Sequence, residues 1–495
     1  MELFLGLDVG TSGVKAILVT ETGAVEAAAT APLSLSTPQP GWAEQDPESW
    51  WAASQTAIRG VLARASAARV AAVGISGQMH SSVFLDREGK VIRPALLWCD
   101  GRTTAQCREI EARVGGESRL RDLVCNPALE GFTLPKVLWL RSQEPAAFAR
   151  LATVLLAKDF VRLRLTGDAA TEPSDASGTL MYDPARLTWS RELMEALGLP
   201  LSLLPPVGGS SEVLGRLSGE AARLTGLAAG TPVVGGGADN ACGAAGVGVV
   251  TPGEAVSSWG TSGTVLAPTS EPRVDPALRA HTFCHVAPRT WYVMGVVLSA
   301  GGSFAWYRDQ LARDRAGSDQ ADDRLVEEAA GVPPGADGVT FLPYLQGERT
   351  PHRNASLRGA FVGLSLAHTR AHLTRAVLEG VCFALKDSVE ILRELGVAPG
   401  YLLLTGGGAR NPFIRRLQAD VFGLPVTTVN REEGPAYGAA LLAAVGGGAF
   451  PDLRSAAQRT LQRAPVAPPD AEAHRQYQEI YRRFRAALSA ARPVA

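Results

Sequence analysis

The chain contains 495 residues, and its 48 Lys and Arg residues are balanced by 49 Asp and Glu residues, which gives a formal net charge of −1. At about 100–200 residues per domain this length predicts roughly two to four domains, and the 46% content of hydrophobic residues excludes a disordered chain. The balanced charge excludes a general nucleic-acid binder, because proteins that hold a phosphate backbone carry a basic excess.

The cellular setting is indicated by three features of the sequence. The first ten residues predict a strand rather than a signal peptide, since they lack a basic start and Asp8 interrupts the apolar run. The uncharged run from Gly434 to Pro451 suits a buried helix followed by a turn better than a membrane span, because it contains Pro and clustered Gly. The six cysteines form no Cys-x-x-Cys pair, which disfavours disulfides and zinc; they are Cys99, Cys107, Cys125, Cys242, Cys284 and Cys382. We therefore expect a cytoplasmic protein that binds neither membrane nor nucleic acid.

The first elements predict a β-hairpin followed by alternating helices and strands. An apolar strand over residues 3–8 leads into the turn Gly10-Thr11-Ser12-Gly13 and a second strand over residues 14–19. A helix is expected after Asp46, which is an N-cap residue followed by Pro47. Residues 70–76 predict a buried strand that leads into Gly77-Gln78-Met79-His80.

The second half of the chain repeats this opening. A strand over residues 254–259 ends in Gly260-Thr261-Ser262-Gly263 and continues into a further strand. The repeat lies about half a chain length after the first hairpin, and it predicts two similar α/β halves, residues 1–250 and 251–495, with a boundary near Thr251. A closing helix is expected to carry a core stripe formed by Tyr477, Ile480, Tyr481, Phe484 and Leu488.

The two Gly-Thr-Ser-Gly turns are candidates for holding the phosphates of one nucleotide. Glycine-rich turns present unblocked backbone N–H groups, and the sequence contains no Walker A pattern that would offer another phosphate loop. Only the first hairpin carries a carboxylate, Asp8, at the position where the second has Ser258. A single carboxylate beside phosphates is placed to hold Mg²⁺, which keeps several waters and takes few protein ligands.

Asp239 is the second carboxylate of interest, because it follows a short strand over residues 232–234 and a glycine-rich segment. It can serve either as the carboxylate that accepts the proton of an alcohol during phosphoryl transfer or as a cap of the next helix. A third glycine-rich segment, residues 405–411, lies between a strand over residues 401–404 and a helix over residues 412–422. It can hold an adenosine or can be a tight turn alone.

These motifs resemble the two phosphate motifs and the adenosine motif of the sugar kinase/actin/Hsp70 superfamily. Residues 131–139 and 359–379 are similar to the two signatures of the FGGY carbohydrate kinases, and the likeness runs from Glu2 to about Ala444 in the family's order. The resemblance implies two ribonuclease H-like (actin-like ATPase) α/β domains with ATP and Mg²⁺ in the cleft between them. It is strongest to the members of the family that phosphorylate D-xylulose, and Cys99 stands where Asn is common among them.

The resemblance assigns roles to individual residues. Asp239 would be the general base and Asp8 would serve the metal. Sugar contacts would come from Met79, His80, Trp98, Asp239 and Asn240, although His80 taken alone also fits a satisfied polar residue at a strand end. The nucleotide would be bound by Gly10, Thr11, Ser12, Lys15, Gly260, Thr261, Ser262, Trp306, Gly407, Gly408 and Asn411.

The leading hypothesis is therefore ATP-dependent phosphorylation of D-xylulose to D-xylulose 5-phosphate, with homodimerisation expected by analogy. Another sugar or polyol of the family, such as L-ribulose, gluconate or glycerol, remains an alternative substrate. An actin- or Hsp70-like ATPase is the alternative from another class. The pairs Met79-His80 and Asp239-Asn240 and the absence of a separate peptide-binding domain disfavour it.

Overall fold

The computed structural model describes residues 2–313, 321–431 and 433–490. Within them, the first half of the chain forms a seven-stranded sheet with the order β11-β12-β5-β1-β2-β3, and β13 pairs with β5. Its strands are β1 (Leu3–Val9), β2 (Gly13–Thr20), β3 (Val25–Pro32), β5 (Val70–Gly77), β11 (Val213–Arg216), β12 (Pro232–Val234) and β13 (Gly237–Ala238).

The second half forms, within the same described residues, a six-stranded sheet with the order β16-β17-β15-β14-β20-β21. Its strands are β14 (Glu254–Trp259), β15 (Gly263–Thr269), β16 (His281–Cys284), β17 (Trp291–Val297), β20 (Tyr401–Gly406) and β21 (Val426–Thr427). Short strand pairs lie outside the sheets and are β4 (Glu44–Gln45) with β7 (Ala95–Leu96), β6 (Val83–Leu85) with β8 (Thr153–Leu155), β9 (Tyr182–Asp183) with β10 (Thr188–Trp189), and β18 (Thr340–Leu342) with β19 (Ala360–Val362).

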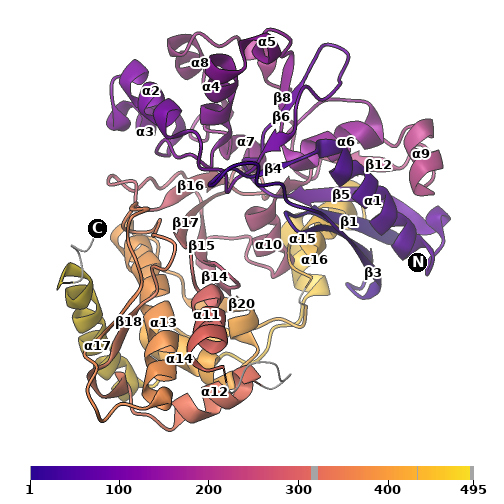
Figure 1. Cartoon of the computed structure of the whole chain (residues 1–495). Helices are drawn as coiled ribbons and strands as arrows, with labels where there is room; N and C mark the ends of the chain where they lie inside the picture. Colours follow the sequence, from indigo (N-terminus) through magenta and orange to yellow (C-terminus); the bar gives the residue numbers. More distant parts are fainter. Residues whose placement is uncertain (1, 314–320, 432, 491–495) are drawn as a thin grey trace.

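The two sheets share one pairing pattern. β1 pairs antiparallel with β2 and parallel with β5, and β14 pairs antiparallel with β15 and parallel with β20. Each Gly-Thr-Ser-Gly turn joins the antiparallel pair of its own sheet. The pattern agrees with the two α/β domains expected from the repeat, which lie one above the other in Figure 1.

Helices cover both sheets, as Figure 1 shows. Helix α1 (Pro47–Leu62) begins as expected, because the Asp46 carboxylate accepts a hydrogen bond from the backbone N–H of Glu48 at 3.0 Å. The other helices of the first half are α2 (Thr104–Val114), α3 (Glu117–Val124), α4 (Thr133–Gln143), α5 (Pro145–Phe148), α6 (Ala157–Thr166), α7 (Pro173–Ser177), α8 (Arg191–Ala196), α9 (Gly219–Thr225) and α10 (Asp239–Gly246). The second half has α11 (Gly301–Leu311), α12 (Ala321–Ala330), α13 (Arg370–Glu394), α14 (Pro412–Phe422), α15 (Pro435–Gly446), α16 (Leu453–Thr460) and α17 (Ala471–Ala490).

Helix α15 belongs to the second half by sequence but packs on β1 and β5 of the first sheet. Figure 1 shows it as a yellow helix beside the indigo strands. A Cβ atom at Gly6 would lie 2.0 Å from the carbonyl oxygen of Ala436, and one at Gly74 would lie 2.0 Å from that of Ala439. Glycine is therefore required where this helix crosses the sheet. A cut at residue 251 separates α15 from the sheet that it covers, and the boundary near Thr251 stays a prediction.

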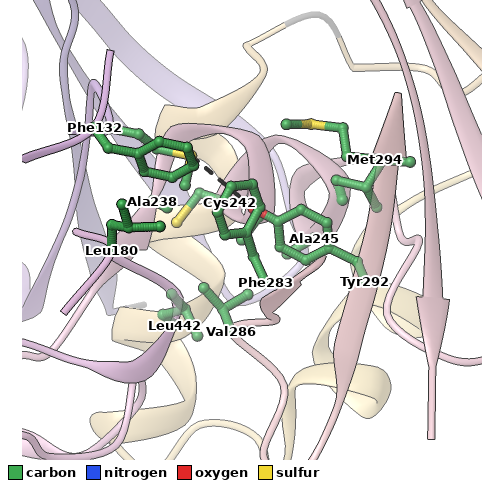
Figure 2. Packing of buried hydrophobic residues seen from close by; sticks show 14 of the residues in the cluster. Phe132, Leu180, Ala238, Cys242, Ala245, Phe283, Val286, Tyr292, Met294 and Leu442 are labelled. Atoms are coloured by element: carbon green, nitrogen blue, oxygen red, sulfur yellow. Dashed lines mark hydrogen bonds between the residues drawn. The ribbon is translucent and has the colours of Figure 1, made fainter. Parts of the chain in front are cut away.

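One apolar cluster joins the two halves. Figure 2 shows Phe283 and Tyr292, from β16 and β17, packed among Phe132, Leu180 and the α10 residue Cys242. The stripe expected on the closing helix is confirmed, because Tyr477, Ile480, Tyr481, Phe484 and Leu488 are all buried on α17. Within the described ranges, the helices lack the combination of length and apolar composition that crossing a membrane requires.

Candidate active site

The first hairpin carries a half-buried carboxylate near the end of its first strand. Asp8 lies opposite Lys15 in β2 and opposite Ser76 in β5. Burial raises the pKa of Asp8 to about 6, and the Ser76 hydroxyl and the Lys15 ammonium oppose that shift. Its Oδ1 atom is buried and has no hydrogen-bond partner among the described residues. An oxygen in this state is available to an ion or to water.

The turn of the first hairpin is held by side chains of the first half. The N–H of Gly10 donates to the carbonyl of Gly13 at 3.1 Å, and the exposed Ser12 is the tip of the turn. The Thr11 hydroxyl donates to Gln78 Oε1 at 2.9 Å and accepts from the indole N–H of Trp98 at 3.0 Å. Trp98, expected beside the sugar, is thus bonded to the first Gly-Thr-Ser-Gly turn, and the residue remains 37% exposed.

Asp239 is the first residue of α10, immediately after β13. The N-cap position belongs to Ala238, so the alternative interpretation of Asp239 as a helix cap is not supported. Burial, together with the negative charge of Asp8, raises the pKa of Asp239 to about 7, and the backbone and side-chain amides of Asn240 oppose that shift. A carboxylate with a pKa near neutrality is matched to a general base.

A buried network fixes the backbone before Asp239. The N–H of Ala238 donates to the hydroxyl of Ser174 at 2.9 Å, and that hydroxyl donates to Glu172 Oε1 at 2.7 Å. Glu172 also accepts from the hydroxyl of Ser210 at 2.8 Å. The ammonium of Lys158 lies 3.7 Å from Glu172 and balances part of its charge. The spacing of these residues along the chain does not predict that they meet in one network.

The residues expected at the sugar form a second group around α10. The side-chain amide of Asn240 lies 3.6 Å from the sulfur of Met79. His80 adopts a left-handed backbone conformation with φ of 68°, and its Nδ1 contacts the carbonyl of Gly178. Burial lowers the pKa of His80 to about 3, so the ring is neutral and can take part in hydrogen bonds as donor and acceptor.

The second hairpin is held by backbone groups. The N–H of Gly301 at the start of α11 donates to the carbonyl of Gly260 at 2.8 Å, and the N–H groups of Ala300 and Gly302 donate to that of Thr261 at 3.0 and 2.9 Å. Gly260, Thr261 and Ser262 are exposed, whereas Gly263 is buried. Trp306, on the same helix, stacks on Phe341 and is 37% exposed.

The third segment ends β20 and begins α14. Gly408 is buried against Trp259, because a Cβ atom there would lie 2.6 Å from the indole ring. The side chain of Asn411 caps α14 by accepting from Phe413 N–H, and it donates to Asp323 at 3.1 Å. Gly408 and Asn411 therefore shape this segment, while Gly407 lines the neighbouring cavity.

A cavity of about 750 Å³ connects the start of α10 with the second hairpin and the third segment, and its lining includes neither the first hairpin nor Met79, His80 and Trp98. It is lined by Asp239 and Asn240, by Ser258 and Thr264 of the second hairpin, and by the third segment. Sequence reasoning placed the basic residue Arg410 only within the third segment, and it missed Arg415, Arg431 and the lining by Gly434 and Pro435 at the start of α15. Three guanidinium groups give the cavity the charge that phosphates require. Among the described residues, no group of three or more His, Cys, Asp or Glu side chains is arranged to hold a metal ion.

Family comparisons agree with this arrangement. The model of the N-terminal domain of the FGGY family of carbohydrate kinases matches residues 3–246, and that of the C-terminal domain matches residues 255–447. The chain belongs to the FGGY family of carbohydrate kinases. This confirms the family inferred from the motifs, and with it an ATP-dependent sugar kinase.

Individual relatives are similar over nearly the whole chain. Xylulose kinase of Bacillus subtilis (strain 168) is 39% identical, with 97% of this chain and 95% of the relative covered. Xylulose kinase of Escherichia coli (strain K12) is 40% identical, with 98% of both covered. The crystal structure of xylulose kinase from Rhodospirillum rubrum is similar with a TM-score of 0.92 and 32% identity over 99% of each chain.

Proposed function

We propose that this carbohydrate kinase transfers the γ-phosphoryl group of ATP to the terminal hydroxyl of D-xylulose and forms D-xylulose 5-phosphate. The observation that carries the proposal is the position of Asp239, whose carboxylate has a pKa of about 7 and lines the cavity beside the second hairpin. The choice of D-xylulose is supported by the relatives of about 40% identity, which are xylulose kinases.

In this proposal Asp239 orients the sugar hydroxyl and accepts its proton as the O–P bond forms. Met79, His80 and Asn240 bind the sugar, and the buried Ser174 network keeps the start of α10 in place. The amides of the two Gly-Thr-Ser-Gly turns, with Lys15, hold the phosphates. The base and ribose occupy the cavity at Gly407, with Trp306 at its border.

Asp8 fits the Mg²⁺ that such a transfer uses, because its buried Oδ1 lacks a hydrogen-bond partner among the described residues. A bound ion would neutralise charge on the phosphates. Asp8 would hold it directly or through water. We also propose a cytoplasmic location and a homodimer, which cell fractionation and light scattering on the purified protein test.

The substrate is tested by measuring ADP formation with D-xylulose, L-ribulose, gluconate, glycerol and no sugar. Stimulation by D-xylulose with the highest kcat/KM supports the proposal. A higher value for another compound reassigns the substrate within the family. ATP consumption that is indifferent to every sugar contradicts a kinase of small sugars and favours an ATPase.

The sugar contact of His80 is tested by His80→Ala. Loss of the ring leaves a sugar group unpaired, so KM for D-xylulose should rise far more than KM for ATP. A change confined to KM for ATP places His80 outside the sugar site.

A further inference from the structure

A loop of the second half, residues 345–354, reaches the first half beside the proposed sugar site. Its ends are tied together, because the N–H of Glu348 donates to the carbonyl of Asn354 at 2.9 Å and the reverse bond is 2.8 Å long. The N–H of Thr350 donates to the carbonyl of Val296 in β17 at 3.0 Å. The guanidinium of Arg353 pairs with Glu117 of α3. The loop is therefore anchored in both halves.

Arg349 of this loop lies next to the surroundings of His80. A Cβ atom added to Gly131 would lie 3.8 Å from Nη2 of Arg349. The carbonyl of Gly131 accepts a bond from Lys136 Nζ at 2.6 Å, and the same ammonium donates to the His80 carbonyl at 3.2 Å. The ring of Phe132, the next residue, lies 4.7 Å from the His80 ring between centroids.

The guanidinium of Arg349 has no hydrogen bond or ion pair with any residue in the described ranges 2–313, 321–431 and 433–490. The residue is only partly exposed, and burial lowers the pKa of its guanidinium, while the negative charges of Glu348 and Glu130 oppose that shift. A guanidinium has five N–H donors and no acceptor. Leaving these donors unpaired away from bulk water is costly, so this group is placed to meet a ligand that accepts hydrogen bonds.

His80 supplies the complementary chemistry. Its Nδ1 faces the carbonyl oxygen of Gly178, which can only accept, so Nδ1 carries the ring hydrogen. Burial keeps the ring neutral, and the charges of Lys136 and Arg349 lower the pKa of His80 in the same direction. Nε2 is therefore an acceptor, suited to a sugar hydroxyl. Arg349 offers donors beside it.

We propose that Arg349 is a specificity-determining residue whose guanidinium donates to the keto oxygen of an open-chain ketose, while Nε2 of His80 accepts from a neighbouring hydroxyl. The proposal rests on the proposed function and extends it to a choice between ketoses and polyols. The keto oxygen is the one oxygen of such a sugar that accepts hydrogen bonds without donating any, so it matches a group that only donates. Hydroxyls, which both donate and accept hydrogen bonds, match the acceptor Nε2 of His80.

The test compares the wild-type enzyme with Arg349→Met, Arg349→Lys and the matched control Arg353→Met on the same loop. Binding of D-xylulose, of xylitol, its reduced form, and of gluconate is measured by calorimetry, and steady-state kinetics give KM for ATP. We expect Arg349→Met to weaken D-xylulose binding about 10–100-fold. Xylitol binding should change less than about threefold, as should KM for ATP. Arg349→Lys, which keeps a charged donor, should recover part of the affinity, and Arg353→Met should leave the preference for D-xylulose unchanged.

Each of the following outcomes contradicts the proposed bond between Arg349 and the keto oxygen. D-xylulose affinity within about threefold of wild type in Arg349→Met excludes a bond to the keto oxygen. Parallel losses for D-xylulose and xylitol, or a larger loss for gluconate than for D-xylulose, exclude keto recognition as well. If Arg349→Met does not fold, the wild-type enzyme decides, because equal affinities of the wild type for D-xylulose and for xylitol exclude recognition of the keto oxygen. A wild-type enzyme that does not phosphorylate D-xylulose contradicts the proposed function itself, whereas an active wild type with an unaffected variant contradicts only the role of Arg349.

Discussion

The two Gly-Thr-Ser-Gly hairpins have the same turn sequence but different surroundings. The first turn is held by side chains, since Thr11 bonds to Gln78 and Trp98, and its strand carries the half-buried Asp8 next to its last residue. The second is held by N–H groups at the start of α11, and its strand carries Ser258 in place of the carboxylate.

This difference indicates that the two turns, although identical in sequence, have different tasks. The first hairpin is connected through side chains to residues expected at the metal and the sugar. The second is a backbone support whose strands line the cavity. Asp239 lies where the two meet, because it lines that cavity and is influenced by the charge of Asp8. Substitutions in either hairpin should therefore affect different kinetic parameters.

The largest effect is expected at the shared residue. Asp239→Asn keeps the shape but removes the basicity, so kcat should fall about 10²–10⁴-fold while ATP binding survives. ATP hydrolysis without sugar should fall as well, if water attack uses the same base. Measurements of kcat, nucleotide affinity and melting temperature distinguish the loss of the base from a loss of nucleotide binding or of stability. A stable variant with near-normal kcat contradicts the role of Asp239 as base.

Asp8→Asn tests the role of the carboxylate, which the first hairpin has and the second lacks. We expect activity at limiting Mg²⁺ to fall about 10–100-fold, because the amide no longer attracts the cation. Ser258→Ala, at the matching position of the second hairpin, should leave the Mg²⁺ dependence unchanged. Titration of activity with Mg²⁺ measures both. Equal behaviour of the two variants contradicts the assignment of the metal to Asp8.

The pH dependence of kcat/KM should report the ionisation of Asp239. The pKa of Asp239 is raised to about 7, so the protonated, inactive form predominates below that pH. We expect kcat/KM to fall about tenfold for each pH unit below about 7. An acidic limb near the ordinary Asp pKa of 3.8 contradicts a raised pKa in the free enzyme.

Gly301→Ala should disturb the second hairpin selectively. The new Cβ atom would lie 2.5 Å from the carbonyl oxygen of Gly260, and overpacking of this kind costs about 1–3 kcal/mol. KM for ATP should rise severalfold while KM for the sugar changes little. Gly302→Ala is a milder control, since its Cβ atom would lie 3.1 Å from the Thr261 carbonyl. A larger effect of Gly302→Ala than of Gly301→Ala would show that the support lies elsewhere.

Trp98→Phe should have the smallest effect and tests the side-chain support of the first turn. It removes one hydrogen bond to the Thr11 hydroxyl, which corresponds to roughly 0.5–1.5 kcal/mol. Nucleotide affinity should fall by roughly 2–10-fold. An unchanged nucleotide affinity with a higher KM for the sugar assigns Trp98 to the sugar alone.

Much of the fold followed from local patterns. The strand β12 and the helix α14 have the bounds that the sequence predicted, and both hairpins were found from their turns. Such elements are predictable because capping, turn chemistry and apolar periodicity act between residues that are close in the chain. The placement of α15 on β1 and β5 was not predicted. It depends on glycines at Gly6 and Gly74 that matter only where a distant helix crosses the sheet.

Within the site, the two glycine turns, the single carboxylate Asp8 and the candidate base Asp239 could be found from the residue order alone. Three further features became visible only in the folded chain: the pKa of Asp239 near neutrality, the support of the preceding backbone by Ser174 and Glu172, and the place of Arg349 beside the surroundings of His80. The physical reason is that burial, charge and hydrogen bonding depend on distances in space between residues far apart in the chain. The spacing of residues within one motif does not contain those distances.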